Sequence, residues 1–226
     1  MKIFFSIFPI LFCLNLSAHA ASGSSGSHSI GFGVGYTGAS QTDLNSWSSA
    51  QNAAGAQLTS GFEYSFTYIY RFTSSMFALA LRPSYISESA GATGVNNSLT
   101  GIILYPILRI YPLENSFIHF FIQGGIGWGS LTGTTNFNGN SITYSGSDFG
   151  ALAGLGAEFC FTDHQCMTIE GDARYHAIPR STISSSSGNW NGTLTGPIGH
   201  ELEYNGTDVG NTMSGIQGIL QYTLKF

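Results

Sequence analysis

The chain has 226 residues, of which only 8% are charged and 14% are aromatic. Globular proteins average about 25% charged residues, so this chain has too few charges to cover a wholly aqueous surface. The many aromatic residues exclude a disordered chain, and the lack of a basic cluster argues against nucleic acid as a partner. After the N-terminus, no apolar run approaches the roughly 20 residues of a transmembrane helix. Strand-length apolar faces in lipid would explain this composition.

The first twenty residues have the pattern of a secretory signal peptide. Lys2 precedes an apolar run from Ile3 to Leu14, and Ala18-His19-Ala20 matches an A-x-A cleavage site. A Gly/Ser-rich stretch follows, which is typical of a flexible segment. The predicted organisation is therefore a signal peptide over residues 1–20, a flexible leader over 21–28 and one domain over 29–226.

Two kinds of side chain alternate along the chain, first over residues 28–37 and most clearly from Gly61 to Phe72. In the second segment, GFEYSFTYIYRF, every other residue is aromatic, and the residues between them include Glu63 and Arg71. Successive side chains of a strand point to opposite faces, so each segment predicts a strand. A soluble sheet would bury the aromatic face, whereas a lipid-embedded barrel would turn it toward lipid and the polar face toward the lumen.

The whole chain predicts eight strands whose connections alternate between long and short. The strands are expected over residues 28–37, 61–72, 76–86, 99–111, 117–129, 146–161, 166–178 and 212–226, with a break in pairing at Pro83. Short turns are expected at 73–75, 112–116 and 162–165, and long loops at 38–59, 87–98, 130–145 and 179–211. Barrels with both termini in the periplasm sort their connections in this way, whereas a Greek-key sandwich has no reason to do so. The prediction is an all-β fold, an eight-stranded antiparallel up-and-down transmembrane β-barrel.

Most of the few charged residues in the strands belong to the inward-facing sets. Eight strands leave an interior just wide enough for side chains to fill, and a buried charge must be paired. We therefore expect an ionic network that fills the lumen, with Arg109 and His119 opposed across their turn. One layer near the short turns would contain Arg71, Arg109, His119, Glu158 and Glu170, and a second layer above it would contain Arg82, Asp172 and Arg174.

Cys160 and Cys166 flank a tight turn on two neighbouring strands. Opposed residues of antiparallel strands have Cα atoms about 4.5–5.5 Å apart, which is within the range of a disulfide. An exported protein is in an oxidising compartment, so we expect a disulfide. The alternative is a pair of reduced, inert thiols.

The C-terminal segment resembles the assembly signature of Gram-negative outer-membrane barrels. Its terminal Phe226 follows alternating apolar residues, namely Leu220, Tyr222 and Leu224, and Gly218 departs from the pattern. The chain as a whole resembles the small eight-stranded outer-membrane barrels that include the OmpA transmembrane domain, OmpX and the Opa-type proteins. The resemblance implies a location in the outer membrane, contact with the lipid bilayer, and recognition of the last strand by the assembly machinery.

The sequence leaves three functional hypotheses. The first is a monomeric, non-enzymatic barrel without catalytic residues, metal or cofactor, whose surface loops serve a structural role or bind an extracellular partner. The second is an outer-leaflet lipid-modifying hydrolase using His176 and Ser181 with Glu170 or Asp172. The lipid A deacylase motif has a Ser-Asn pair two residues after its histidine, and His176 lacks that pair. The third is a soluble exported barrel that carries a ligand.

Overall fold

The computed structural model describes residues 26–92, 94–188, 190 and 194–226. The predicted signal peptide and most of the predicted leader lie outside these residues, and the first strand begins at Ser27, within that leader. The elements are β1 (Ser27–Gly38), α1 (Thr42–Ala50), η1 (Ala54–Ala56), β2 (Ser60–Arg71), β3 (Phe77–Ala92), β4 (Val95–Glu114), β5 (Ile118–Phe137), β6 (Asn140–Thr162), β7 (Gln165–Tyr175), β8 (Ala177–Ile178), β9 (Thr182–Ser187), β10 (Leu194–Thr195), β11 (Glu203–Tyr204), β12 (Thr207–Asp208), β13 (Asn211–Thr212) and β14 (Gly215–Lys225).

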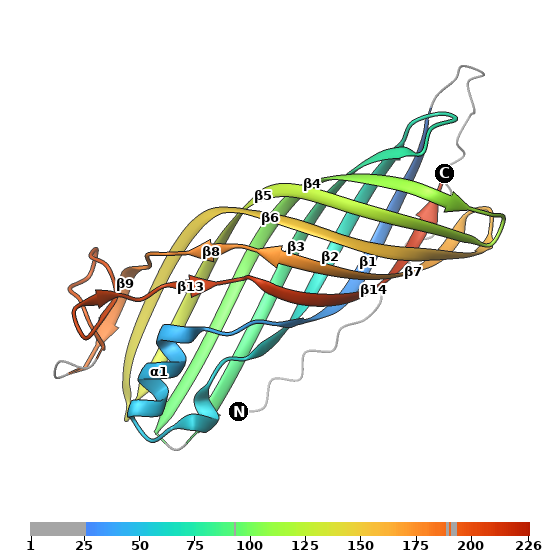
Figure 1. The fold of residues 1–226 in the computed structure, drawn as a ribbon. Helices are drawn as coiled ribbons and strands as arrows, with labels where there is room; N and C mark the ends of the chain where they lie inside the picture. Colours follow the sequence, from blue (N-terminus) through green and yellow to red (C-terminus); the bar gives the residue numbers. More distant parts are fainter. Residues whose placement is uncertain (1–25, 93, 189, 191–193) are drawn as a thin grey trace.

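Eight long strands form a closed antiparallel ring, which confirms the predicted barrel (Figure 1). The ring runs from β1 to β7 in chain order, and β14 closes it by pairing with both β7 and β1. Closure pairs each of these strands on both sides, as the interior of a bilayer requires. The short turns β2–β3, β4–β5 and β6–β7 lie at the same end as the C-terminus (Figure 1). We call this end of the barrel the turn end and the other the loop end.

Side chains of the ring alternate between an exposed apolar outer face and a buried inner face. On β2, Phe62 and Tyr64 are more than half exposed. Glu63, which lies between them, and Thr67, further along the strand, are buried. On β4, the exposed Ile102 alternates with the buried Ile103. The barrel therefore buries its polar face and exposes its aromatic face, which is the reverse of a soluble sheet. Neither helix of the described chain is long and apolar enough to span a membrane.

Two predicted long loops are instead extensions of the strands. β3 and β4 remain paired as far as Ala92 and Val95, and β5 and β6 as far as Phe137 and Asn140. The loops expected at 87–98 and 130–145 are thus wrong. The outer faces of these extensions carry Ser, Thr, Asn and Gly, so they lack the apolar contrast that marks the rest of each strand. Backbone pairing needs no such contrast, and the ladder therefore continues beyond the aromatic band.

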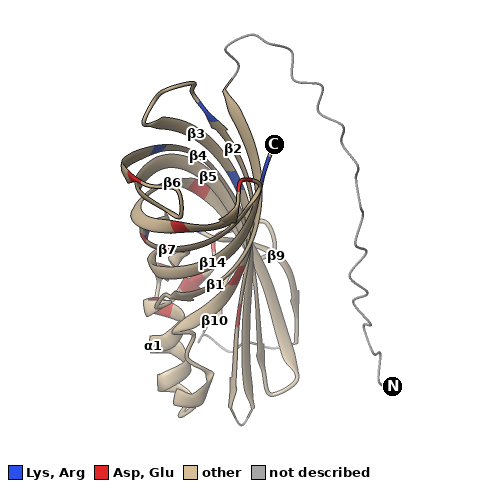
Figure 2. Cartoon of the chain, turned by 90° about the vertical axis from the view of Figure 1, so that its right-hand side faces the viewer, with Lys and Arg blue, Asp and Glu red and all other residues tan. Residues whose placement is uncertain are grey.

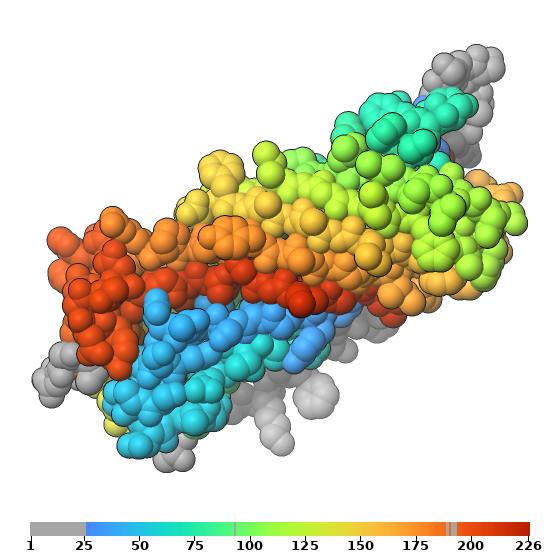
Figure 3. All heavy atoms as spheres, viewed as in Figure 1, coloured from blue at the N-terminus to red at the C-terminus, as the bar shows by residue number. Residues whose placement is uncertain are grey.

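The other two predicted loops contain short elements at the loop end. Residues 38–59 form α1 and η1, and residues 179–211 include β9 to β12 and the start of β13. We call α1, η1 and the described residues between 177 and 214 the loop platform. Its two parts lie side by side in the ribbon and space-filling views (Figures 1 and 3), where the Asp43 carboxylate accepts a 2.9 Å hydrogen bond from the Gly210 amide. The Trp47, Phe137 and Trp190 rings pack together there, with centroids 5.7–6.3 Å apart.

Prolines interrupt the ring at two seams. Between β2 and β3, Ser65 pairs with Ser84 and the next pair is Tyr68 with Leu81, so the residues between these pairs are unpaired in this ladder. This gap confirms the break predicted at Pro83. The partners of β4 and β5 likewise skip Pro106, which the sequence analysis did not single out. Proline has no amide hydrogen to donate, so each proline removes one rung of its ladder.

Candidate functional site: the charged lumen

A network of charged side chains lies inside the barrel, and Arg82 is at its centre. Its guanidinium lies 2.7 Å from a Glu170 oxygen and 2.9 Å from an Asp172 oxygen. Arg82 comes from β3, whereas both carboxylates come from β7 on another part of the wall. All three side chains are almost completely buried, so the pairs bridge the lumen away from water. Figure 2 marks the charged positions along the strands.

Arg109 extends this network toward the turn end. It donates to Glu170 at 2.9 Å and to the Gln123 side chain at 2.8 Å, and it lies 3.7 Å from Glu158. Its guanidinium also stacks over the Phe121 ring, 4.3 Å from the centroid. Glu170 therefore binds both Arg82 and Arg109. Glu170 thus connects Arg109 of the first predicted layer to Arg82 of the second, whereas Arg174 of the second layer pairs elsewhere, with Glu63.

Glu158 lies among polar and charged side chains near the turn end. The Tyr111 hydroxyl donates to it at 2.7 Å, the Lys225 ammonium lies 3.0 Å away, and His119 Nδ1 is 3.6 Å away. Tyr111 and Lys225 are not among the site residues predicted from the sequence. The alternation of the last strand places Lys225 on its inward face, and this facing could have identified it as a member of the network. Its ammonium ties β14 to β6 across the barrel mouth.

A separate ion pair lies closer to the loop end. Arg174 on β7 donates to Glu63 on β2 at 2.7 Å, and both side chains are 1% exposed. Its Nε also donates to the Met213 carbonyl, which connects the pair to the loop platform. Glu63 was also missed as a site residue, although the alternation of its strand placed it on the polar face. Inside the barrel, the three buried arginines and Lys225 thus face Glu63, Glu158, Glu170 and Asp172.

Two details of the predicted network are wrong. Arg71 pairs with Glu114 at the rim, where both side chains are about a quarter to a third exposed, so it does not join the buried layer. Arg109 faces Gln123 rather than His119, which faces Glu114. The reason is that β4 continues to Glu114 and β5 begins at Ile118, so the turn lies at 115–117 rather than at 112–116.

The contacts of His176 do not form a nucleophile–base pair with Ser181. His176 Nε2 lies 3.0 Å from the Asp148 carbonyl, which can only accept, so Nε2 carries the proton. Nδ1 then accepts from the Tyr105 hydroxyl at 2.9 Å. Ser181 Oγ accepts instead from Asn211 at 2.7 Å. Both ring nitrogens of His176 are engaged, so neither is free to accept a proton from a serine.

Cys160 and Cys166 are directly opposed on β6 and β7, and their sulfur atoms are bonded in the structure. Their Cα atoms are 4.0 Å apart. We expect the mature protein, denatured without a reductant, to expose no thiol to an alkylating reagent, because the loop closes in an oxidising compartment. Mass spectrometry after iodoacetamide treatment measures this. Two alkylated cysteines before reduction would show that the bridge does not form in the cell.

Comparison with known proteins places this architecture in a family. The model of the outer membrane protein beta-barrel domain family matches residues 7–210. The chain belongs to this family. A search of curated proteins finds no match. Among solved structures, the chain is similar to OprG from Pseudomonas aeruginosa, with 14% identity, a TM-score of 0.54, and coverage of 90% of this chain and 97% of OprG. It is also similar to a major outer membrane protein from Thermus thermophilus, with 10% identity, a TM-score of 0.55 and coverage of 88% and 98%.

Membership of this family gives the barrel its place and orientation. The protein is an outer-membrane β-barrel, so the exposed aromatic face contacts lipid, and the hypothesis of a soluble exported barrel is wrong. In such barrels the short turns lie on the periplasmic side and the loops outside. The turn end is therefore periplasmic, and the loop platform is extracellular.

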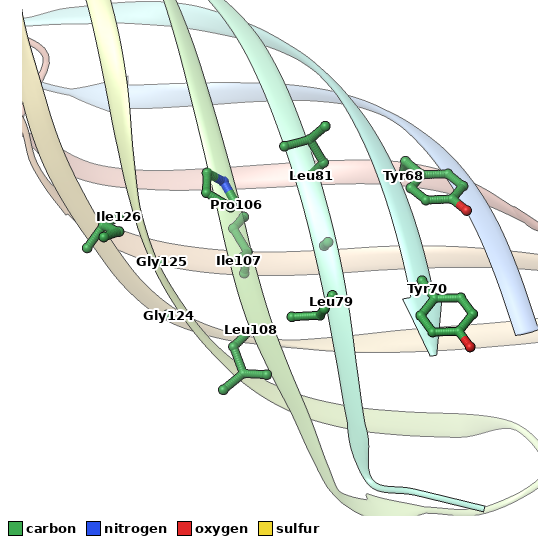
Figure 4. A pocket seen from close by; sticks show the side chains of 11 residues that line it. Tyr68, Tyr70, Leu79, Leu81, Pro106, Ile107, Leu108, Gly124, Gly125 and Ile126 are labelled. Carbon is green, nitrogen blue, oxygen red and sulfur yellow. The ribbon is translucent and has the colours of Figure 1, made fainter. Parts of the chain in front are cut away.

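The outer wall of this outer-membrane barrel has a shallow apolar groove that does not belong to the charged site (Figure 4). It crosses β2 to β5 next to the rung that Pro106 removes. Its lining consists of Tyr68, Tyr70, Leu79, Ala80, Leu81, Pro106, Ile107, Leu108, Gly124, Gly125 and Ile126. These residues bring no carboxylate, histidine, lysine or arginine into the groove, and the surface is of the kind that acyl chains cover.

Proposed function

We propose that this protein is a non-enzymatic outer-membrane barrel that is closed to solutes and presents its loop platform to an extracellular partner. One observation carries the proposal, namely the chain of ion pairs from Arg82 through Glu170 and Arg109 to Glu158. A buried ion pair is costly to desolvate, so it persists only where the geometry satisfies both charges. A network of this kind holds side chains in place across the lumen.

Apolar side chains support the closure. Ile103, Tyr105 and Ile107 point inward from β4 and are each at most 1% exposed. Phe121 lies beneath the Arg109 guanidinium and is equally buried. The interior of an eight-stranded barrel is just wide enough for its own side chains to fill it. These residues and the ion pairs together leave little space for a solute path.

The loop platform supports the second half of the proposal, because it is tied to the barrel. Gln41 donates to the Thr212 carbonyl at 2.6 Å and accepts from the Thr212 amide at 2.9 Å. It also donates to the Glu88 carboxylate on β3. Trp47, on α1, is completely buried. Binding residues collect on surface loops held by a rigid scaffold, and these contacts hold the loops in that way.

Replacing Glu158 with Gln tests the closure. We expect wild-type protein in a planar lipid bilayer to show no steady ion conductance. The Glu158→Gln variant should conduct more, because Lys225 and Arg109 lose the carboxylate that holds them across the lumen. Single-channel recording measures the difference.

The matched control is Glu203→Gln, which removes a carboxylate from the exposed surface of β11. Glu88, which the sequence analysis placed in a loop, is unsuitable, because it is buried on β3 and accepts from Gln41. Steady conductance by the wild type, or equal conductance by the two variants, would contradict closure by this network.

A further inference from the structure

Three side chains at the periplasmic mouth point their acceptor atoms toward the ammonium of Lys225. The Lys225 ammonium lies 3.0 Å from Glu158 Oε2, 3.2 Å from His119 Nδ1 and 3.3 Å from Cys160 Sγ. An ammonium has only hydrogens to donate, so the unprotonated Nδ1 of His119 faces it. Carboxylate oxygen, neutral imidazole nitrogen and cysteine sulfur are the ligand types that zinc takes in proteins. In the described part of the chain, this is the place where three such groups converge.

The spacing of these atoms matches a tetrahedral zinc site. Zinc lies about 2.0–2.3 Å from its ligands, so two ligand atoms of a tetrahedron are roughly 3.3–3.8 Å apart. His119 Nδ1 lies 3.6 Å from Glu158 Oε2 and 3.8 Å from Cys160 Sγ. All three ligand atoms are within 4.8 Å of one another. The side chains of His119 and Lys225 are 18% and 21% exposed, so an ion can reach the cluster from the periplasmic side.

The redox state of the cysteines decides whether the two sulfur ligands exist. Cys160 is bonded to Cys166 on the neighbouring strand, and a thiolate rather than a disulfide sulfur is the metal ligand. A dithiol reductant would break this bond by supplying two electrons and two protons, becoming a disulfide itself. Zinc would then replace the two thiol protons, which are released. The resulting ligands are one carboxylate, one imidazole and two thiolates.

We propose that reduction of the Cys160–Cys166 disulfide converts this cluster into a Zn²⁺ site, for which Lys225 is a tethered competitor. The ligands are His119 from β5, Glu158 and Cys160 from β6, and Cys166 from β7. While the disulfide is intact, the Lys225 ammonium occupies the position of the metal. Metal binding would break the ion pair between Lys225 on β14 and Glu158 on β6. In its place, the metal would link β5, β6 and β7.

Cobalt titration of the mature protein, folded in detergent micelles, tests the proposal. Co²⁺ serves as the probe because its bonds to thiolates absorb in the near ultraviolet. After reduction with a phosphine, we expect one Co²⁺ per chain, a thiolate-to-cobalt band, and displacement of Co²⁺ by Zn²⁺. The oxidised protein should show no such band. A reduced protein without the band would overturn the proposal.

Two variants separate this site from a pair of free thiols. In reduced protein, Lys225→Met should bind the metal more tightly than wild type, because the competing cation is gone. His119→Asn should weaken binding by at least about tenfold, since even the loss of a residue that only supports a ligand costs 10–100-fold. The matched control is His200→Asn, on the exposed extracellular surface. Unchanged affinity in Lys225→Met, or equal affinity in the two histidine variants, would show that the cysteines bind metal without the cluster.

Discussion

Replacing Arg82 with Met is expected to lower the free energy of unfolding by about 3–5 kcal/mol. Arg82 holds both Glu170 and Asp172 in a fully buried environment, and Met fills a similar volume without a charge. The loss arises because Asp172 remains in the lumen without its ion-pair partner and Glu170 keeps only Arg109. Urea unfolding of the protein in lipid vesicles, followed by tryptophan fluorescence, measures the change.

Arg180→Met is the matched control for this prediction. Arg180 also forms an ion pair, 3.0 Å from Asp208, but its side chain is 69% exposed. Exposed pairs contribute about 0–1 kcal/mol, so this variant should unfold almost as the wild type does. The double variant Arg82→Met with Asp172→Asn should recover part of the loss, because one of the unpaired carboxylates is removed. Equal losses in the two single arginine variants would contradict the role of Arg82 as the centre of the network.

Replacing Phe66 with Arg is expected to cost about 2–4 kcal/mol of stability in the membrane. Phe66 lies near the middle of β2 on the outer face, where it packs against Phe32 with ring centroids 5.2 Å apart. A cation at this depth must leave water for the acyl chains. The fraction of protein that folds into lipid vesicles, read from the mobility of unboiled samples on a gel, measures the effect.

The same substitution at the rim provides the control. Leu113 is 65% exposed near the end of β4, next to the periplasmic turn. The cost of an arginine falls to about 0–1 kcal/mol at the membrane interface, so Leu113→Arg should fold nearly as well as wild type. If both variants fold poorly to the same extent, Phe66 does not lie at the depth assigned to it.

The sequence alone was sufficient to predict the barrel because lipid imposes a strict pattern on each strand. Every residue that faces acyl chains must be apolar, and a strand presents every second residue to them. The alternation of Phe62, Tyr64 and Phe66 with Glu63 and Thr67 therefore determines which residues face the lumen. The same requirement confines polar segments to the two ends of the barrel, so the existence of the three periplasmic turns could also be predicted, although the β4–β5 turn lies later in the chain than expected.

Outside the lipid, alternation of apolar and polar residues is no longer required, so only the tertiary structure shows where the strands end. The strand extensions at the loop end have polar outer faces, although they bury Leu131, Ile142 and Tyr144 on their inner faces, so the alternation that marks the lipid-facing band did not reveal them. A local signal was present for one of them, because Asn138-Gly139 is the type of pair that closes a two-residue hairpin. Both residues have positive φ, 47° and 87°, as such a turn requires. The flanking Ser/Thr/Asn composition obscured this signal.

Pairing across the lumen also depends on the tertiary structure. Alternation assigns a residue to the inner face, but it does not say which strand lies opposite once the ring has closed. Arg174 meets Glu63, which is 111 positions away, and Lys225 meets Glu158 from the last strand. The tilt of the strands and the stagger between them set the height of each charge in the barrel. Facing is a local property of each strand, whereas partner choice depends on how all eight strands are staggered around the ring.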